Sequence, residues 1–372
     1  MQGRLLSASH IIDLRLVCAI NRLEIIMRHT ISGIIMLAAL LLTGCGGTNS
    51  SSGKANDTAA SRDIFAMDTF MSLKAYGSNA DEALDKAGER ISVLEEELSV
   101  TNENSDIWRI DHAGGNPVQV SEDTAAILKK ALEISDDTDG ALNVCLYPVV
   151  SAWGFTTGEY RIPDDEEIPS LLKNTDWHSL HLDGSTVTLP EKYQIDAGAL
   201  AKGYTSDEVM EIMRESGVDS AIVSLGGNVQ ALGTKPDGSL WKVAVRDPFS
   251  PDTDMCVVEV GEKAVITSGN YERYFTGDDG NNYWHIIDGN DGYPADNGAV
   301  SVTVIGSSGI ECDALSTALF VMGYPAACDY WRSRQDFDMV IVTDDQRIYY
   351  TEGIADVFSN ISSMPAEVIP VA

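Results

Sequence analysis

The stretch AIVSLGGNVQALGTKPDGSLWKVAV, residues 221–245, contains two runs typical of β-strands, Ala221–Leu225 and Trp241–Val245. Between them lies KPDG at 235–238, a turn sequence in which proline fixes φ, aspartate bonds the local backbone and glycine tolerates unusual dihedral angles. Strands joined by turns this short pair antiparallel, because parallel strands need a long crossover connection. The stretch therefore predicts an antiparallel sheet.

The rest of the chain repeats strand signals and adds helices. Runs rich in β-branched and aromatic residues predict further strands at 256–260, 284–287, 301–305, 339–343 and 347–351. Apolar residues on one face predict a helix with Ser78 as N-cap and a second after Ser121. A third helix should run over Leu200–Ser216, where Gly217 ends it. We find no glycine-rich dinucleotide or NTP motif. The pattern predicts an α+β fold with antiparallel sheets and packed helices.

The N-terminal segment has the layout of a bacterial lipoprotein leader. An apolar run at 31–42, too short to span a bilayer, precedes Gly44-Cys45. We predict residues 1–44 as the signal peptide, with Met27 as an alternative start, and Cys45 as the residue lipidated with palmitate. Residues 45–62 are a flexible Gly/Ser tether and 63–372 the folded domain. The alternative is a buried N-terminal helix. We expect a protein of the bacterial cell envelope, lipid-anchored on the extracytoplasmic side of the membrane.

Charge and cysteine content exclude several functions. The 372 residues include 25 Lys and Arg against 57 Asp and Glu, a net charge of −32. Such a surface repels nucleic acid and anionic lipid, so we exclude a nucleic-acid function and assign membrane contact to the lipid anchor. Beyond the anchor, the scattered cysteines show no metal-ligand spacing and are either core residues or unassigned disulfide partners: Cys145, Cys256, Cys312 and Cys328.

Three segments carry groups suited to a phosphate and metal site. Asp196 and Lys202 stand among small residues at a strand-to-helix junction, where backbone amides can approach an anion; alternatively, Asp196 only starts the helix. Asp313 and Thr317, four apart, present a carboxylate and a hydroxyl that suit Mg²⁺; alternatively, both serve their own helix. His285 is either a catalytic base or a structural histidine.

Eight motifs between Ala66 and Thr317 occur in the same order as in one family. The chain resembles the FAD:protein FMN transferases, the ApbE-like flavin transferases, many of which are lipoproteins. No single motif is specific for the family, but the order of all eight is specific. The resemblance implies a T-fold-related, two-lobed α+β flavin transferase domain over 63–372. The motifs are Ala66–Phe70, Ser105–Ile110, the 140–155 stretch, Asp196–Tyr204, Ser224–Asn228, Thr267–Tyr271, His285–Asp288 and Asp313–Thr317.

The resemblance implies roles for individual positions. Asp313 and Thr317 match side-chain metal ligands, and Ala199 matches a main-chain metal ligand. His285 and Ile287 match positions that line the flavin near the reacting phosphate, and His285 is the candidate base. The remaining flavin-contacting positions are Met67, Ala141, Leu142, Asn143, Asp196 and Lys202.

The implied reaction is Mg²⁺-dependent transfer of FMN from FAD, through a phosphoester bond, to a Thr or Ser hydroxyl of an exported or membrane-bound flavoprotein acceptor, with release of AMP. Two alternatives stay open: an Mg²⁺-dependent FAD pyrophosphatase giving FMN and AMP, and a non-catalytic flavin- or solute-binding lipoprotein. This chain departs from the family at three places. The family usually has Asp where this chain has Asn143, and Thr where it has Cys145. It commonly has Pro-x-Thr-Gly where this chain has Gly289–Gly292. The chain lacks the Ser/Thr-Gly-Ala-Ser/Thr target sequence, so we expect it to modify another protein.

Overall fold

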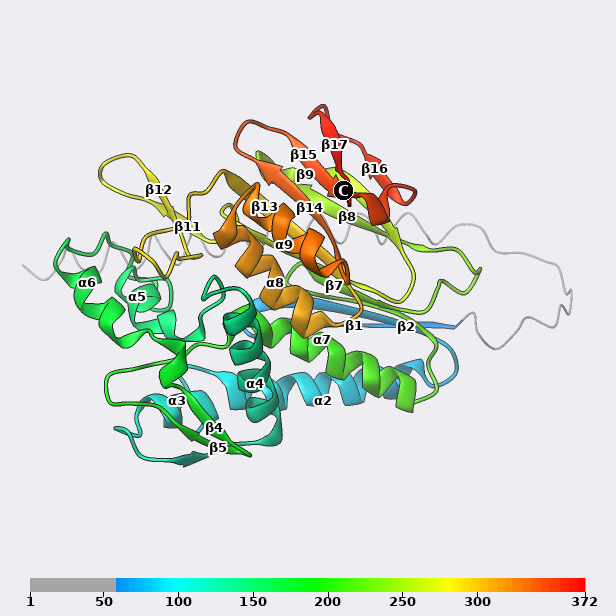
Figure 1. The fold of residues 1–372 in the computed structure, drawn as a ribbon. Coiled ribbons are helices and arrows are strands. Elements are labelled where there is room, and N and C mark those ends of the chain that lie inside the picture. Colours follow the sequence, from blue (N-terminus) through cyan, green and yellow to red (C-terminus); the bar gives the residue numbers. More distant parts are fainter. Residues whose placement is uncertain (1–57, 372) are drawn as a thin grey trace, which may run out of the picture. The chain divides into compact units, whose positions relative to one another are not determined.

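The computed structural model describes residues 58–371, which are built around one nine-stranded sheet (Figure 1). Neighbouring strands pair antiparallel, except for the last pair, which is parallel. The predicted α+β class with antiparallel sheets is confirmed. In spatial order the strands are β1 (Ala59–Ala66), β2 (Thr69–Tyr76), β6 (Ser220–Leu225), β7 (Asn228–Leu232), β10 (Ala264–Gly269), β13 (Ala299–Gly306), β14 (Asp338–Thr343), β15 (Ile348–Thr351) and β17 (Ala366–Ile369).

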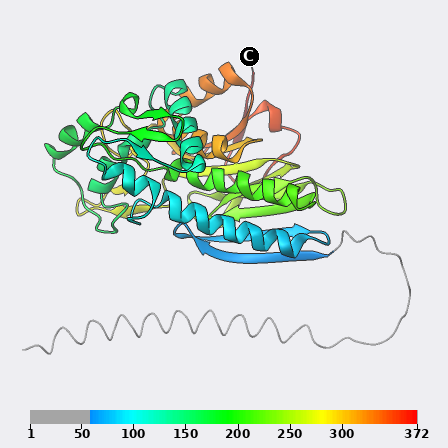
Figure 2. The same cartoon turned by 90° about the horizontal axis from the view of Figure 1, so that it is seen from below.

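Helices cover one face of this sheet and a smaller sheet covers part of the other (Figures 1 and 2). The helices are α2 (Ala80–Leu98), α7 (Gly198–Glu215), α8 (Gly309–Met322) and α9 (Ala326–Arg334). The smaller sheet consists of β8 (Trp241–Asp247), β9 (Ser250–Val260) and β16 (Phe358–Asn360). Alternate side chains of β8 and β9, such as Val243 and Val258, are buried with Val265 and Val340 of the large sheet. The period-two alternation thus fixes which face of each strand is covered.

A second lobe is formed mainly by the chain between α2 and α7 (Figure 1). Its elements are α3 (Asp106–Asp111), β3 (Val118–Gln119), α4 (Glu122–Asp137), α5 (Tyr147–Ala152), α6 (Glu167–Leu171), β4 (His181–Asp183) and β5 (Thr186–Thr188). The hairpin of β11 (Tyr274–Thr276) and β12 (Asn282–Trp284) packs on it through Trp153. This fully buried indole lies 5.0 Å from the Tyr283 ring and donates a 2.9 Å hydrogen bond to the Gly292 carbonyl.

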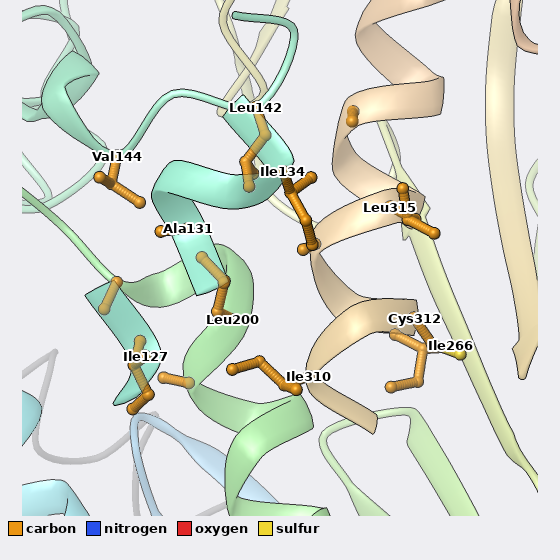
Figure 3. Packing of buried hydrophobic residues seen from close by; sticks show 14 of the residues in the cluster. Ile127, Ala131, Ile134, Leu142, Val144, Leu200, Ile266, Ile310, Cys312 and Leu315 are labelled. Atoms are coloured by element: carbon orange, nitrogen blue, oxygen red, sulfur yellow. The ribbon is translucent and has the colours of Figure 1, made fainter. Parts of the chain in front are cut away.

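The two lobes share one hydrophobic core (Figure 3). On α4, Ile127, Ala131 and Ile134 recur at spacings of three and four and therefore lie on one face of the helix. This face is buried with Leu200 of α7 and Leu315 of α8 in the same cluster. Contact among α4, α7 and α8 thus packs the second lobe against the helices of the large sheet.

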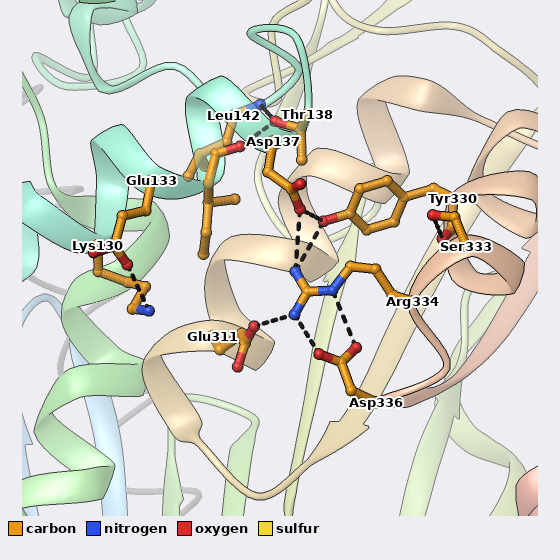
Figure 4. A network of polar contacts seen from close by, with 11 residues as sticks. Lys130, Glu133, Asp137, Thr138, Leu142, Glu311, Tyr330, Ser333, Arg334 and Asp336 are labelled. Carbon is orange, nitrogen blue, oxygen red and sulfur yellow. Dashed lines mark hydrogen bonds and ion pairs between the residues drawn. The ribbon is translucent and has the colours of Figure 1, made fainter.

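A partly buried arginine joins the same helices from the outside (Figure 4). Arg334, at the end of α9, pairs with Asp137 of α4 at 3.2 Å, with Glu311 of α8 at 2.6 Å and with Asp336 at 2.6 Å. The fork of a guanidinium suits several carboxylates at once. This network holds the first turn of α8 against α4.

The helix boundaries agree with the predictions to within two residues, and one cap differs. Helix α4 follows Ser121, whose Oγ accepts the Thr124 N–H at 3.1 Å, as predicted. The N-cap of α2 is Asn79 rather than Ser78, and no side chain caps that end. Helix α7 begins at Gly198, ahead of the predicted Leu200.

Other predictions need correction. Strand β1 begins at Ala59, inside the range 45–62 predicted as tether. The strand predicted at 284–287 ends at Trp284, because the chain then turns; only Ile287 pairs again, with Pro294. All four cysteines of the described part are buried and free, so the disulfide alternative is wrong there.

The predicted leader 1–44, with Met27, and the lipidation residue Cys45 lie outside the described residues. Between residues 58 and 371, no helix combines the length and the apolarity that crossing a membrane requires.

Candidate active site

A cavity of about 1000 Å³ lies where the two lobes meet. Its walls come from the β1–β2 turn, the loop before α5, the first turn of α7, the end of β10, the segment after β12 and the middle of α8. The fold brings together in this cavity every site residue of the described part that the sequence predicts: Met67, Ala141, Leu142, Asn143, Asp196, Ala199, Lys202, His285, Ile287, Asp313 and Thr317.

The crossing of α7 and α8 places Asp313. A Cβ atom on Gly203 would lie 2.3 Å from the Gly309 carbonyl oxygen and 2.6 Å from the Asp313 Cβ, so only glycine permits this approach. The Gly203 N–H therefore donates to Asp313 Oδ2 at 2.8 Å, and the Asn228 amide donates to Oδ1 at 2.9 Å. Burial raises the pKa of Asp313, while the charge of Lys202 and these hydrogen bonds oppose that rise.

Two further residues with oxygen donors line the cavity together with this carboxylate, Thr317 and Ala199. Thr317 lies one helical turn after Asp313, and its Oγ1 is 3.2 Å from the Ser268 hydroxyl of β10. Ala199 lies in the first turn of α7. In a regular helix its carbonyl would accept the N–H of Gly203, four residues later, but that N–H donates to Asp313. Because a carbonyl has two lone pairs, the Ala199 oxygen retains capacity for a cation.

This donor set fits Mg²⁺. Mg²⁺ binds hard oxygen ligands, usually with one or two protein carboxylates, and completes its octahedral shell with water and substrate phosphates. Residues 58–371 contain no cluster of three or more His, Cys, Asp or Glu side chains that could hold a metal. One carboxylate, one hydroxyl and one carbonyl are instead the set expected where phosphates supply the remaining ligands.

Asp196 fixes the second lobe to α7. Its Oδ1 accepts the Gly198 N–H at 2.8 Å at the start of α7, and its own N–H donates to the Val144 carbonyl at 2.9 Å. The preceding residue, Ile195, donates to Asp111 Oδ1 at 2.8 Å, and burial raises the pKa of Asp111 to about 8. Burial also raises the pKa of Asp196. The helix-start alternative for Asp196 is thus correct, and the same residue also faces the cavity.

Lys202 supplies positive charge to the cavity. It lies on α7, and its charge lowers the pKa values of Asp196, Glu272 and Asp313, opposing the effect of burial on each. Within residues 58–371, no carboxylate lies within 4.0 Å of its ammonium group. An ammonium group that faces a cavity without a close partner is suited to an anionic substrate.

The departure at Asn143 has a structural reason. Its amide donates to the Thr175 carbonyl at 2.8 Å, and its Oδ1 accepts the Cys145 N–H at 2.9 Å, which caps the 3₁₀ turn Val144–Leu146. An aspartate could not donate the first of these bonds. Asn143 still lines the cavity, whereas Cys145 is buried in the shared core.

Met67 occupies an unusual backbone conformation. Met67 and Asp68 form the two-residue turn between β1 and β2, with φ values of 50° and 56°. Two positive φ values define a type I′ turn, which normally carries Asn or Gly. The Met67 N–H donates to Glu95 Oε1 at 2.7 Å. Strained conformations persist where surrounding contacts fix them, often at functional sites.

His285 lies at the cavity wall with its tautomer fixed. Its Nδ1 is 3.2 Å from the Arg273 carbonyl oxygen, which can only accept, so Nδ1 carries the proton and Nε2 is left as an acceptor. His285 is half-buried and lines the cavity. Burial, followed by the charges of Arg273 and Lys202, lowers the pKa of His285 to about 4. The imidazole is therefore neutral at pH 7.

We expect His285 to make the apo protein acid-sensitive. Between pH 6.5 and about 4 the unfolded chain binds a proton at this position that the folded chain does not, so its contribution to stability is lost as the pH falls through that window. Urea unfolding of wild type and His285→Gln at pH 7 and pH 5 measures it. The variant should lose less stability between the two pH values, and equal losses would contradict the depressed pKa.

Several residues that line the cavity are not predicted from the sequence. Asn228 follows two turn glycines in a motif quoted for the resemblance, but its bond to Asp313 depends on the β6–β7 hairpin. Glu95, on α2, and Arg246, on β8, also line the cavity, and neither has a local sequence signal.

Known proteins are similar to this chain in sequence and fold. The model of the ApbE family matches residues 67–341. The FAD:protein FMN transferase of Treponema pallidum is 31% identical over 83% of this chain and 91% of its own length, and that of Klebsiella pneumoniae is 34% identical over 74% and 86%. The crystal structure of the ApbE protein of Thermotoga maritima matches with a TM-score of 0.76 and 29% identity over 81% of this chain and 99% of its own length.

The fold and these relatives define an enzyme of the flavin transferase class. The chain belongs to the ApbE family. The resemblance inferred from the sequence motifs is thereby confirmed.

Proposed function

We propose that this enzyme transfers FMN from FAD to a Ser or Thr hydroxyl of a flavoprotein acceptor in an Mg²⁺-dependent reaction that releases AMP. The observation that carries the proposal is that Asp313, Thr317 and Ala199 line the same cavity as Lys202. A pyrophosphate needs both a cation site and further positive charge, and a cavity of this size admits a dinucleotide.

Different residues of the cavity have different roles in this reaction. Mg²⁺ held by Asp313, Thr317 and the Ala199 carbonyl would supply Lewis-acid neutralisation of the pyrophosphate charge. Lys202 binds and orients the phosphates. His285 Nε2 accepts the proton of the acceptor hydroxyl as its oxygen bonds to the FMN-side phosphorus. The bond from that phosphorus to the bridging oxygen breaks, and AMP leaves with the electron pair.

The test uses the purified mature domain, FAD, Mg²⁺ and an acceptor domain with a Ser/Thr-Gly-Ala-Ser/Thr target sequence. Intact mass spectrometry should show one added FMN per acceptor, and EDTA should abolish it while excess Mg²⁺ restores it. Release of FMN and AMP with an unmodified acceptor would instead establish a pyrophosphatase. No FAD turnover would identify a binding protein.

We also propose that the enzyme acts in the cell envelope as a lipoprotein anchored through Cys45, with 1–44 removed as its leader. The spacing of the apolar run, Gly44 and Cys45 supports this. Cys45→Ala should move the protein from the membrane fraction to the soluble fraction and abolish palmitate labelling. A variant that stays membrane-bound and unlabelled would contradict the anchor.

A further inference from the structure

An aromatic pair stands exposed on the β1–β2 hairpin. Phe65 and Phe70 are directly opposite in the strand register, with ring centroids 5.2 Å apart in an edge-on arrangement. They are 63% and 78% exposed. Single exposed apolar residues are ordinary, but a pair of phenylalanines arranged against each other forms a patch that favours a partner.

This pair borders the cavity without lining it. The turn that joins the two strands contributes Met67 and Asp68 to the cavity wall, and Thr69 at the start of β2 lines it as well. Phe65 and Phe70 flank that turn but are absent from the lining, so they are not placed to contact a substrate held inside. Figure 2 shows the hairpin, in blue, along one edge of the described part.

A third exposed phenylalanine lies between residues that line the cavity. Phe249, 41% exposed, lies at the tip of the β8–β9 hairpin between Arg246 and Pro251, which both line the cavity. We call Phe65, Phe70 and Phe249 the apolar rim. Two hairpins that are far apart in sequence thus carry exposed phenylalanines beside residues that line the same cavity.

We propose that the apolar rim docks the acceptor protein, by an apolar surface next to the hydroxyl that receives FMN; this rests on the proposed function. The hydroxyl has to reach a phosphorus inside the cavity, so the acceptor backbone around it has to cover the rim. The chain carries a net charge of −32, so binding through charge alone would favour a basic acceptor. Apolar contact at the rim gives affinity that does not depend on the charge of the acceptor. Buried aromatic side chains commonly contribute most of an interface's affinity.

The test compares the Phe65→Ser/Phe70→Ser double variant with Ile361→Ser. Ile361 is 57% exposed and does not line the cavity, so it controls for the loss of a surface apolar group. We expect the KM for the acceptor domain to rise about tenfold in the double variant, with the Kd for FAD unchanged, and Ile361→Ser to match wild type. An unchanged acceptor KM would overturn the proposal.

A binding measurement separates this proposal from the reaction. Wild type and both variants are titrated with acceptor in which the target hydroxyl is removed by Thr→Ala, so that no transfer occurs. Weaker binding by the double variant alone supports docking even where FMN transfer fails. Equal binding by all three overturns it, as does concentration-dependent dimerisation that the double variant abolishes, because the rim would then bind a second copy.

Discussion

Replacing Asp313 by alanine should lower the rate of FMN transfer by about 100-fold or more, because the change removes the one carboxylate of the proposed cation site. The loss should persist at saturating FAD. Intact acceptor mass against time measures the rate, and a titration with Mg²⁺ shows whether the metal requirement has moved.

Asp313→Asn is the matched control for structure. Alanine leaves the Gly203 N–H and the Asn228 amide without their acceptor, at a cost of about 1–3 kcal/mol for each buried group. Asparagine keeps the shape and one oxygen while it removes the charge. A folded Asp313→Asn protein with a wild-type rate would show that this carboxylate does not hold the cation.

Gly203→Ala should destabilise the fold and abolish FAD binding together. Alanine raises helix propensity by about 1 kcal/mol, but here its Cβ would lie 2.3 Å from a backbone oxygen of α8, so the helices must separate. Overpacking of this kind costs about 3 kcal/mol, which outweighs the gain in propensity. Urea unfolding and FAD fluorescence titration measure the two effects.

Gly261→Ala provides the comparison. At this glycine an added Cβ meets its nearest neighbour at 3.7 Å, an ordinary contact, and φ is not positive. We expect a change in unfolding free energy below about 0.5 kcal/mol and unchanged FAD affinity. If Gly203→Ala behaves in the same way, the close crossing of α7 and α8 does not position Asp313.

Site residues can be predicted from the sequence where a single helix or strand sets their relative positions. Asp313 and Thr317 are four residues apart, and a helix alone places them on one face. Helices α2, α4 and α7 are likewise visible as apolar stripes, because the 3.6-residue period repeats over several turns.

Sequence reasoning fails where distant segments meet. Glu95 reaches the Met67 N–H from another element, and Arg246 lines the cavity only because β8 packs across the large sheet. Short strands are missed for a local reason. Strand β10 ends in Ser268-Gly269, which limits its β-branched run to Val265-Ile266-Thr267, and β7 begins directly after two glycines.

The cavity can form only late in the synthesis of the chain. Met67 is contributed near the start of the described part and Thr317 toward its end, so a growing polypeptide holds half a binding site until α8 has been synthesised and packed. Ligand capture therefore follows completion of the fold and cannot guide its early steps. Protease digestion of refolding intermediates should accordingly give the same fragments with and without FAD until α8 has docked.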